Sequence, residues 1–308
     1  MSFLSDYNLE LRVANILQNI PVNEEIQLTE NKLFVKRLDQ IHPLVNGNKY
    51  YKLKYNVEKV LSQPGQILLT FGGAYSNHIH AAAAAGKAFG IPTIGIIRGD
   101  ELEHSKTLSP TLQFAKSQGM RLEFVTRDAY AEKDTEDFKG WLYEQFGDIH
   151  IVPEGGSNFL GVNGCMEILS EEDKTTFDLI TCAVGTGSTL AGILLSMKPH
   201  QHILGFSSLR HGEWLRDEVI KHLRYFLMDD DAAEELSSQF KIITRYDFGG
   251  YAKWNDELIQ FIEQFESDYG IPLDQVYTGK MMFGLLDMIS NGELNEYRNI
   301  LAVHTGGL

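Results

Sequence analysis

A segment rich in glycine and hydroxyl residues, Gly185-Thr186-Gly187-Ser188-Thr189, has the residue types that bind phosphate. It follows an apolar run and precedes a helical pattern. Its glycines permit a tight turn in which backbone N–H groups and a helix N-terminus surround an anion. It is not a Walker motif, because no Gly-Lys-Ser/Thr follows, and Leu190 stands where Gly-x-Gly-x-x-Gly needs its third glycine. Taken alone, the segment predicts either a phosphate site or a purely structural turn.

A second motif, Gly72-Gly73-Ala74-Tyr75-Ser76-Asn77-His78, also lies between an apolar run and a helical pattern. Ser76 and Asn77 are helix-capping types, and the backbone donors beside them suit a carboxylate or a ring oxygen. An ordinary N-cap explains this motif equally well, but two such turns in separate strand–helix series favour a shared ligand. His78 and His80 lie two residues apart on the predicted helix and therefore diverge, so we expect no metal site and a structural role for His80.

Lys49 lies in a third motif, Asn46-Gly47-Asn48-Lys49-Tyr50-Tyr51-Lys52, where a turn leads into a helical pattern. A helix start disfavours the ammonium form of a lysine, which suits a nucleophilic amine that forms an imine. Lys52, one helical turn later, could supply positive charge to a phosphate. The ordinary alternative for both lysines is a solvated surface charge.

Short apolar segments alternate with helical patterns along most of the chain. Expected strands at 66–71, 93–98, 121–126 and 150–153 form one series, and strands at 179–184, 203–207, 242–244 and 300–303 form a second. This alternation predicts an α/β fold with two open, mostly parallel twisted sheets flanked by helices. Ligands are expected at the carboxyl ends of the strands, in a cleft between the two sheets.

Composition narrows the class of partner. The chain has 308 residues, of which 43% are hydrophobic, enough for an ordinary buried core. Its net charge of -15 opposes binding to nucleic acid and to anionic membranes. The first residues lack a leader pattern, and no segment reaches the roughly 20 apolar residues of a membrane span, so we expect a cytoplasmic protein with no membrane partner. Cys165 and Cys182 fit neither a disulfide framework nor a metal site, and we expect them to be reduced and structural.

The motifs, taken in order, resemble the tryptophan-synthase-β-like (fold type II) pyridoxal-phosphate enzymes, and within them the 1-aminocyclopropane-1-carboxylate deaminase and D-cysteine desulfhydrase family. The resemblance spans nearly the whole chain. Seven ordered blocks carry it: Gly47-Asn48-Lys49-Tyr50-Tyr51-Lys52-Leu53, Gly72-Gly73-Ala74-Tyr75-Ser76-Asn77-His78, Pro153-Glu154-Gly155-Gly156-Ser157-Asn158, Gly185-Thr186-Gly187-Ser188-Thr189, Gly249-Gly250-Tyr251-Ala252, Val276-Tyr277-Thr278-Gly279-Lys280 and His304-Thr305-Gly306-Gly307.

The resemblance implies pyridoxal 5'-phosphate as the cofactor, held as a Schiff base by Lys49. It implies that the turn from Gly185 to Thr189 forms the phosphate cup and that Asn77 binds the ring hydroxyl. Lys52, Thr278 and Thr305 complete the expected cofactor-binding set. A larger cofactor-binding domain is expected at 1–48 and 150–308, a smaller α/β domain at 49–149, and a homodimer as the assembly.

The resemblance also implies the residues that act on a small amino-acid substrate. Ser76 and His78, with Asn77, match the substrate-carboxylate site, and Tyr251 and Tyr277 match the active-site tyrosines. The substrate amine would displace Lys49, and the cofactor would acidify the Cα–H bond. Lys49 or a tyrosine would then take the proton, and loss of a β-substituent would lead to a 2-oxo acid and ammonia.

Two positions distinguish the branches of this family. Members that open the cyclopropane ring typically carry Glu and Leu where this chain has Thr278 and Thr305. A carboxylate keeps the pyridine nitrogen protonated, whereas a neutral hydroxyl only forms a hydrogen bond with it, and that weaker electron sink suffices when a thiolate leaves. We therefore expect D-cysteine to be converted to pyruvate, sulfide and ammonia, although Thr is also a common strand residue.

Other interpretations stay open at this point. The nearest is a 1-aminocyclopropane-1-carboxylate deaminase that gives 2-oxobutanoate and ammonia, followed by serine dehydration or racemisation. From another class, a non-catalytic protein could use the same turns to bind a phosphorylated small molecule. Two segments depart from the family pattern, namely Tyr50-Tyr51 and Ser208-Leu209-Arg210.

Overall fold

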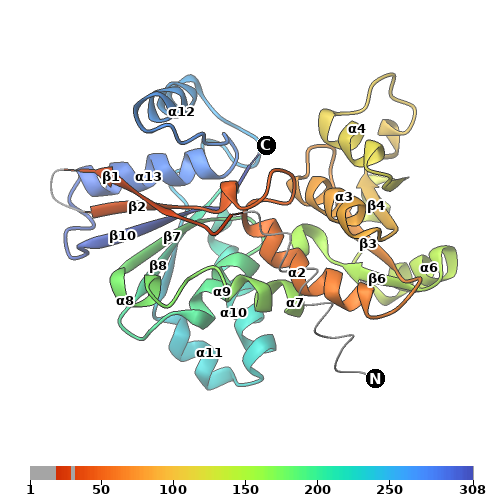
Figure 1. Ribbon diagram of the computed structural model, residues 1–308, viewed down its shortest axis with the longest axis horizontal. Coiled ribbons are helices and arrows are strands. Elements are labelled where there is room, and N and C mark those ends of the chain that lie inside the picture. The colour runs from red at the N-terminus through yellow and green to blue at the C-terminus, as the bar shows by residue number, and fades with distance from the viewer. Residues whose placement is uncertain (1–18, 29–31, 308) are drawn as a thin grey trace. The chain divides into compact units, whose positions relative to one another are not determined.

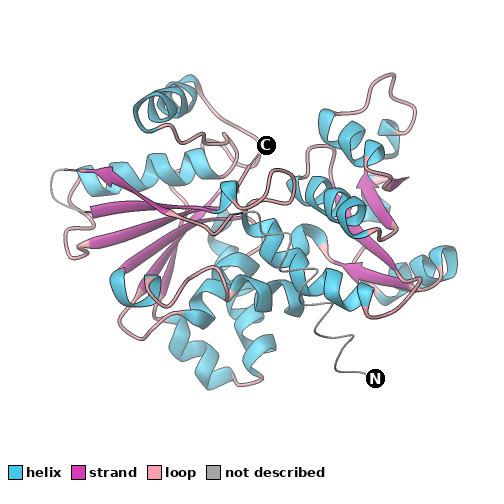
Figure 2. Ribbon diagram, in the orientation of Figure 1, coloured by secondary structure: helices cyan, strands magenta, loops and turns pink. Residues whose placement is uncertain are grey.

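The apolar runs of the sequence form the strands of two mostly parallel sheets in a computed structural model, which describes residues 19–28 and 32–307 (Figure 1, Figure 2). The structure does not describe residues 1–18, 29–31 and 308, all of which belong to the expected larger domain. The expected fold class is confirmed, since helices separate the strands of both series.

The six-stranded sheet has the order β1-β2-β10-β7-β8-β9, with β1 and β2 antiparallel and the other neighbours parallel. Every residue of β7 is buried, as expected of a parallel strand that is covered on both faces. The strands are β1 (Asn23–Gln27), β2 (Lys32–Arg37), β7 (Leu179–Val184), β8 (His202–Ser207), β9 (Phe240–Ile243) and β10 (Asn299–His304).

Helices cover both faces of this sheet. Figure 1 shows α13 (Thr278–Ser290) on one face and α9 (Ser188–Ser196) with α10 (Leu215–Leu227) on the other. Methionine and leucine side chains of α13 pack into a core with the strands, including Met281, Met282 and Leu285. The other helices that follow Gly156 are α7 (Phe159–Cys165), α8 (Asp173–Thr176), η4 (Gly212–Trp214), α11 (Asp230–Ser237) and α12 (Asp256–Tyr269).

The four-stranded sheet is fully parallel and has the order β5-β4-β3-β6. Serine or threonine caps several of its helices through a side-chain oxygen that accepts a backbone N–H, as Ser76 does for α3. Its strands are β3 (Ile67–Gly72), β4 (Thr93–Arg98), β5 (Arg121–Val125) and β6 (Ile149–Val152). Its helices are α3 (Asn77–Phe89), η2 (Asp100–Leu102), α4 (Pro110–Ser117), α5 (Arg127–Ala131), α6 (Glu136–Phe146) and η3 (Glu154–Gly156).

The described chain divides into two compact units. Unit 1 contains His42–Val45 and Lys52–Gly161, and unit 2 contains Asn19–Ile41, Asn46–Tyr51 and the chain from Val162 onward. Helix α2 (Gly47–Leu61) begins in unit 2 and continues into unit 1, so Lys49 belongs to unit 2 and Lys52 to unit 1. The expected domain boundaries and the cleft between the domains stay predictions.

Strands β1 and β2 and the short η1 (Leu38–Gln40) are elements that the sequence pattern did not predict. β2 carries two buried charged residues, Lys36 and Arg37, so its sequence lacks the continuous apolar run by which strands were predicted elsewhere in the chain. Both are paired: Lys36 Nζ lies 2.7 Å from Asp173 Oδ2, and Arg37 forms ion pairs with Glu24 and Asp39. Buried charges are tolerated when they are paired in this way.

Candidate active site

Three neighbouring strands of unit 2 end at the same edge of the six-stranded sheet. β10, β7 and β8 are parallel neighbours, so the residues that follow them, Thr305, Gly185 and Ser208, lie at the carboxyl edge of the sheet. Parallel α/β sheets bind ligands at this edge. The sheet therefore brings together the phosphate-type turn and one of the two threonines that the sequence singled out.

The start of α2 is attached to the end of β10. Gly47 has φ +63°, and a Cβ atom at this position would overlap the backbone carbonyl of Thr305. The N–H of Asn48 donates to the same carbonyl oxygen at 3.1 Å. Only glycine allows so close an approach with this backbone conformation, so Gly47 sets where the first turn of α2 lies.

Lys49 is linked to the glycine-rich turn through Asn48. Lys49 Nζ donates to Asn48 Oδ1 at 2.8 Å, and Asn48 Nδ2 donates to Thr189 Oγ1 at 2.9 Å. Asn48 and Thr189 are both buried. The structure thus brings two predicted site residues together through Asn48, to which the sequence analysis gave no role.

The turn from Gly185 to Thr189 leads directly into α9. Gly187, at the N-cap, has φ +80° and no side chain that could cap the helix. Ser188 and Thr189 are buried in the first turn, and Thr186 Oγ1 lies 3.4 Å from Ser188 Oγ. Backbone N–H groups, hydroxyl groups and a helix N-terminus meet here, which is the donor set that binds a phosphate.

Ser208 lies beside this turn and provides a test of whether a polar ligand fits. Its N–H donates to the carbonyl of Val184, the residue before Gly185, at 3.3 Å. Its buried hydroxyl oxygen has no hydrogen-bond partner among the described residues. A buried hydroxyl that lacks a partner costs about 1–3 kcal/mol, so a polar ligand at the turn would relieve an existing deficit. The sequence analysis treated Ser208 only as a departure from the family pattern.

The two tyrosines of the predicted site are neighbours. The rings of Tyr251 and Tyr277 meet edge to face, with centroids 6.1 Å apart. A Cβ atom at Gly185 would lie 3.2 Å from the Tyr277 ring, so Tyr277 also borders the glycine-rich turn. The structure therefore groups both tyrosines with the phosphate-type turn.

Lys280 holds the backbone that leads to Tyr251. Its buried Nζ donates to the carbonyl oxygens of Asp247 and Gly250, each at 2.7 Å. Burial lowers the pKa of Lys280 to about 8, and the charges of Asp247 and Asp274 oppose this shift. The sequence did not predict a role for Lys280, because the carbonyl groups that accept its hydrogen bonds lie about 30 residues earlier in the chain.

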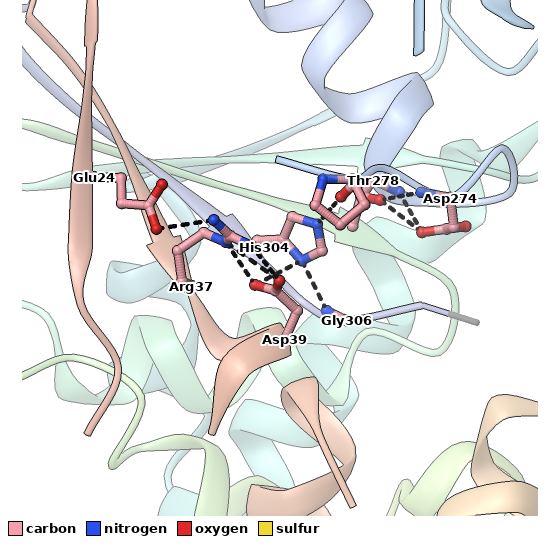
Figure 3. Close-up of polar contacts among 8 residues, drawn as sticks. Glu24, Arg37, Asp39, Asp274, Thr278, His304 and Gly306 are labelled. Carbon is pink, nitrogen blue, oxygen red and sulfur yellow. Dashed lines mark hydrogen bonds and ion pairs between the residues drawn. The ribbon is translucent and has the colours of Figure 1, made fainter. Parts of the chain in front are cut away.

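Thr278 and Asp274 form a closed pair at the start of α13 (Figure 3). The Thr278 hydroxyl donates to Asp274 Oδ2 at 2.7 Å and accepts from the Asp274 N–H at 2.9 Å. The carboxylate also accepts backbone N–H groups from the next turn, at Val276, Tyr277 and Thr278. Thr278 is fully buried, so Asp274 determines the direction of its hydroxyl group.

A charged network lies next to Thr305 (Figure 3). His304 Nε2 donates to the carbonyl of Pro272 at 2.7 Å, and His304 Nδ1 lies 3.4 Å from Asp39 Oδ1. Gly306 N–H donates to His304 Nδ1 at 3.3 Å, and Arg37 donates to Asp39 and Glu24. These contacts fix the backbone on both sides of Thr305.

The predicted substrate-carboxylate residues lie in unit 1. Ser76 Oγ caps α3 by accepting the Ile79 N–H at 3.3 Å, and Asn77 is the first residue of that helix. His78 is buried with its Nε2 2.8 Å from Thr70 Oγ1. Because the Thr70 hydroxyl donates to the Val152 carbonyl, His78 is the donor in that contact.

Lys52 is also buried in unit 1. Its Nζ donates to the Gly155 carbonyl at 3.0 Å, so it is not a solvated surface charge. A Cβ atom at Gly156 would lie 3.0 Å from Lys52 Cβ and 3.1 Å from His78 Cε1, so these three residues pack together. Joint action of this group with the Lys49 group of unit 2 stays a prediction.

His80 stacks on Phe114 with ring centroids 3.8 Å apart, and burial lowers the pKa of His80, as suits a structural histidine. In the ranges that the structure describes, no group of three or more His, Cys, Asp or Glu side chains could hold a metal ion. None of the described helices is long and apolar enough to span a membrane. Cys165 and Cys182 are both buried, and neither forms a disulfide.

The site defined by this fold belongs to a class of enzymes that depend on pyridoxal phosphate. Residues 17–306 match the family described as "Pyridoxal-phosphate dependent enzyme", and the chain belongs to this family. It is therefore an enzyme, its cofactor is pyridoxal 5'-phosphate, and the alternative of a non-catalytic binder is not supported.

Its relatives narrow the family further. The mitochondrial bifunctional D-cysteine desulfhydrase/1-aminocyclopropane-1-carboxylate deaminase of Arabidopsis thaliana is 30% identical over 90% of this chain and 72% of its own length. A Thermotoga maritima protein, provisionally named 1-aminocyclopropane-1-carboxylate deaminase, is 28% identical over 97% of this chain and 96% of its own. The chain thus falls among the deaminases and desulfhydrases, as the resemblance implied.

A solved structure agrees with this placement. The crystal structure of an ACC deaminase homologue matches with a TM-score of 0.73 and 27% identity, covering 96% of this chain and 95% of the other. A fungal L-serine ammonia-lyase from Rhizomucor miehei matches with a TM-score of 0.63 at 15% identity, covering 95% of this chain and 95% of the other, and that likeness concerns the fold alone.

Proposed function

We propose that this chain converts D-cysteine to pyruvate, sulfide and ammonia, with Lys49 as the residue that binds the cofactor covalently. The hydrogen-bond chain from Lys49 through Asn48 to Thr189 carries the proposal. It joins a lysine amine to a glycine-rich helix N-terminus within a single unit. Pyridoxal phosphate needs both groups at once, a lysine for its carbonyl carbon and an anion site for its phosphate.

The residues of unit 2 have distinct proposed tasks. The turn from Gly185 to Thr189 would hold the phosphate, Ser208 would add a hydroxyl to that site, and Thr278 and Thr305 would bind the pyridine nitrogen. When bound, the cofactor supplies an electron sink that acidifies the Cα–H bond of the substrate. Lys49 Nζ or one of the tyrosines Tyr251 and Tyr277 would accept the Cα proton.

The residues of unit 1 have proposed roles in binding the substrate and the cofactor ring. Ser76 and His78 bind the substrate carboxylate together with Asn77, which also binds the ring hydroxyl. The N-terminus of α3, where Ser76 is the N-cap, offers backbone donors and a favourable dipole for that carboxylate. Lys52 is buried, and its proposed role is to supply positive charge for the cofactor phosphate.

Thr278 and Thr305 favour D-cysteine among the candidate substrates. Both positions carry neutral hydroxyls, which suit a reaction whose leaving group, a thiolate, departs readily. The second candidate is the opening of 1-aminocyclopropane-1-carboxylate to 2-oxobutanoate and ammonia, an activity that appears in the names of several relatives. D-serine and β-chloroalanine are further substrates with a leaving group on the β-carbon.

Parallel product analysis tests the proposal. The loaded protein is incubated with D-cysteine, L-cysteine, D-serine and 1-aminocyclopropane-1-carboxylate, and 2-oxo acids and sulfide are measured. Pyruvate and sulfide from D-cysteine are expected, and their absence from a Lys49→Ala variant shows that the reaction belongs to this site. If 1-aminocyclopropane-1-carboxylate alone gives a product, the assignment based on the two threonines is wrong.

We also propose that the enzyme is a cytoplasmic homodimer. Two buried cysteines that form no disulfide suit a reducing compartment, and the dimer follows from the family resemblance. Sedimentation of the loaded enzyme tests the dimer, and fractionation of the native cells tests the compartment.

A further inference from the structure

The strongest unexplained feature of the site is the pairing of Thr278 with Asp274. A hydroxyl group has one proton to donate and two lone pairs that accept. The Thr278 proton goes to Asp274 Oδ2 at 2.7 Å, and one lone pair accepts from the Asp274 N–H at 2.9 Å. Only one lone pair of the Thr278 hydroxyl oxygen remains, so Thr278 can accept a hydrogen bond from a ligand.

Asp274 holds this direction firmly. Its carboxylate accepts the Thr278 hydroxyl and three backbone N–H groups, at distances of 2.7 to 3.0 Å. A hydrogen bond from a hydroxyl to a carboxylate is roughly twice as strong as one between neutral groups. If Thr278 turned to donate to a neutral ring nitrogen, it would therefore exchange a stronger bond for a weaker one.

We propose that Asp274, acting through Thr278, keeps the pyridine nitrogen of the bound cofactor protonated. An unprotonated ring nitrogen would face the Thr278 lone pair with a lone pair of its own, whereas a protonated nitrogen donates to it. The proposal rests on the proposed function, in which Thr278 faces that nitrogen. Asp274 is a positioning residue here, since it acts on the cofactor through Thr278.

Other charged groups around this pair do not reverse the effect. The charge of Asp274 is felt by Lys280, but the Lys280 ammonium donates to the carbonyls of Asp247 and Gly250. His304 donates to the Pro272 carbonyl, and its other nitrogen faces Gly306 N–H and Asp39. Lys280 and His304 thus donate to other groups, and Asp274 is the charged group that the Thr278 hydroxyl contacts.

The pair changes what Thr278 implies about the reaction. A threonine alone would give a weak electron sink, and a carboxylate in direct contact with the ring would give a strong one. In this chain the carboxylate stands one hydroxyl group away, so we expect a sink of intermediate strength. D-cysteine remains the favoured substrate, and ring opening becomes a slower second reaction at the same site.

The test is the ¹⁵N chemical shift of the ring nitrogen in protein loaded with ¹⁵N-labelled pyridoxal phosphate at neutral pH. We expect the shift of a protonated nitrogen in the unmodified protein and in Thr278→Ser, which keeps the hydroxyl. In Asp274→Asn, the new amide can donate to the Thr278 oxygen and free its proton for the ring, so we expect the shift to move toward that of an unprotonated nitrogen.

An unprotonated shift in the unmodified protein overturns the inference without any variant. An unchanged shift in folded Asp274→Asn protein overturns it as well. The proposed function has a separate test, because a thiolate leaves readily enough for D-cysteine to give product with either a protonated or an unprotonated ring nitrogen. Turnover of D-cysteine with an unprotonated ring would sink the inference alone, and a protonated ring without turnover would sink the proposed substrate alone.

Discussion

Replacing Gly47 with alanine should disrupt the start of α2 and weaken cofactor binding. Gly47 has φ +63°, and an added Cβ atom would overlap the Thr305 carbonyl. The left-handed conformation costs about 1–2 kcal/mol, overpacking adds about 1–3 kcal/mol, and loss of the hydrogen bond from Asn48 to Thr305 adds about 0.5–1.5 kcal/mol. We expect the free energy of unfolding to fall by about 2.5–6.5 kcal/mol.

Gly90→Ala is the matched control. Gly90 has φ +69°, close to that of Gly47, but nothing lies within 4 Å of an added Cβ atom. This variant therefore carries the backbone cost without the overlap, and we expect a loss of about 1–2 kcal/mol with unchanged cofactor affinity. The difference between the two variants measures the contact between Gly47 and Thr305.

The assay is urea unfolding followed by circular dichroism, together with titration of pyridoxal phosphate by absorbance. Gly47→Ala should weaken cofactor binding by at least about tenfold, equivalent to 1.4 kcal/mol, because Lys49 lies two residues further along the displaced turn. If the two variants lose equal stability and both bind the cofactor normally, the reasoning about Gly47 is wrong.

Three further predictions follow from buried polar groups. Asp173→Asn should lower the free energy of unfolding by about 3–5 kcal/mol in urea titrations, because Lys36 would remain buried without its carboxylate. Burial raises the pKa of Asp173, but Lys36 and the hydrogen bonds from Asn23 and the Ser170 N–H together outweigh it and hold the pKa below the ordinary 3.8. This stabilisation should therefore be present above that pH and fade as the pH falls through the lowered value. Burial lowers the pKa of Lys280 from an ordinary 10.5 to about 8. Between these two pH values the unfolded chain binds more protons than the folded chain, so the free energy of unfolding should rise with pH. Lys280→Met should remove this rise. Ser208→Ala should leave the stability of the cofactor-free protein unchanged or raise it by up to about 1–3 kcal/mol, because it removes a buried hydroxyl that has no partner among the described residues. It should also weaken cofactor binding, and equal affinity by titration would exclude Ser208 from the site.

Much of the fold was predictable because parallel strands are continuous apolar runs. β3, β4, β7 and β10 were predicted directly from such runs, and glycine-rich turns marked the carboxyl ends of β3 and β7. β2 was not predictable, because its Lys36 and Arg37 look like surface residues until their distant partners are known. Lys36, for example, pairs with Asp173, 137 residues further along the chain.

The site, like the fold, contains residues that the sequence predicted and residues that it did not. Lys49, the turn from Gly185 to Thr189 and the tyrosines were recognised from residue types in a known order. Asn48, Ser208 and Asp274 were not, because each acts through a hydrogen bond, or the lack of one, that only the folded chain reveals. Asn48 bonds Thr189 across 141 residues, a separation at which local sequence patterns carry no information.

The central claim is that Lys49 binds the cofactor. It is tested most directly by reducing the loaded protein with borohydride, which fixes the cofactor to its lysine, and by locating the modified residue by peptide mass spectrometry. The account predicts a phosphopyridoxyl group on Lys49 in the unmodified protein and none in Lys49→Ala. A label on Lys52, on Lys280 or on any other lysine, or no label at all, would contradict it.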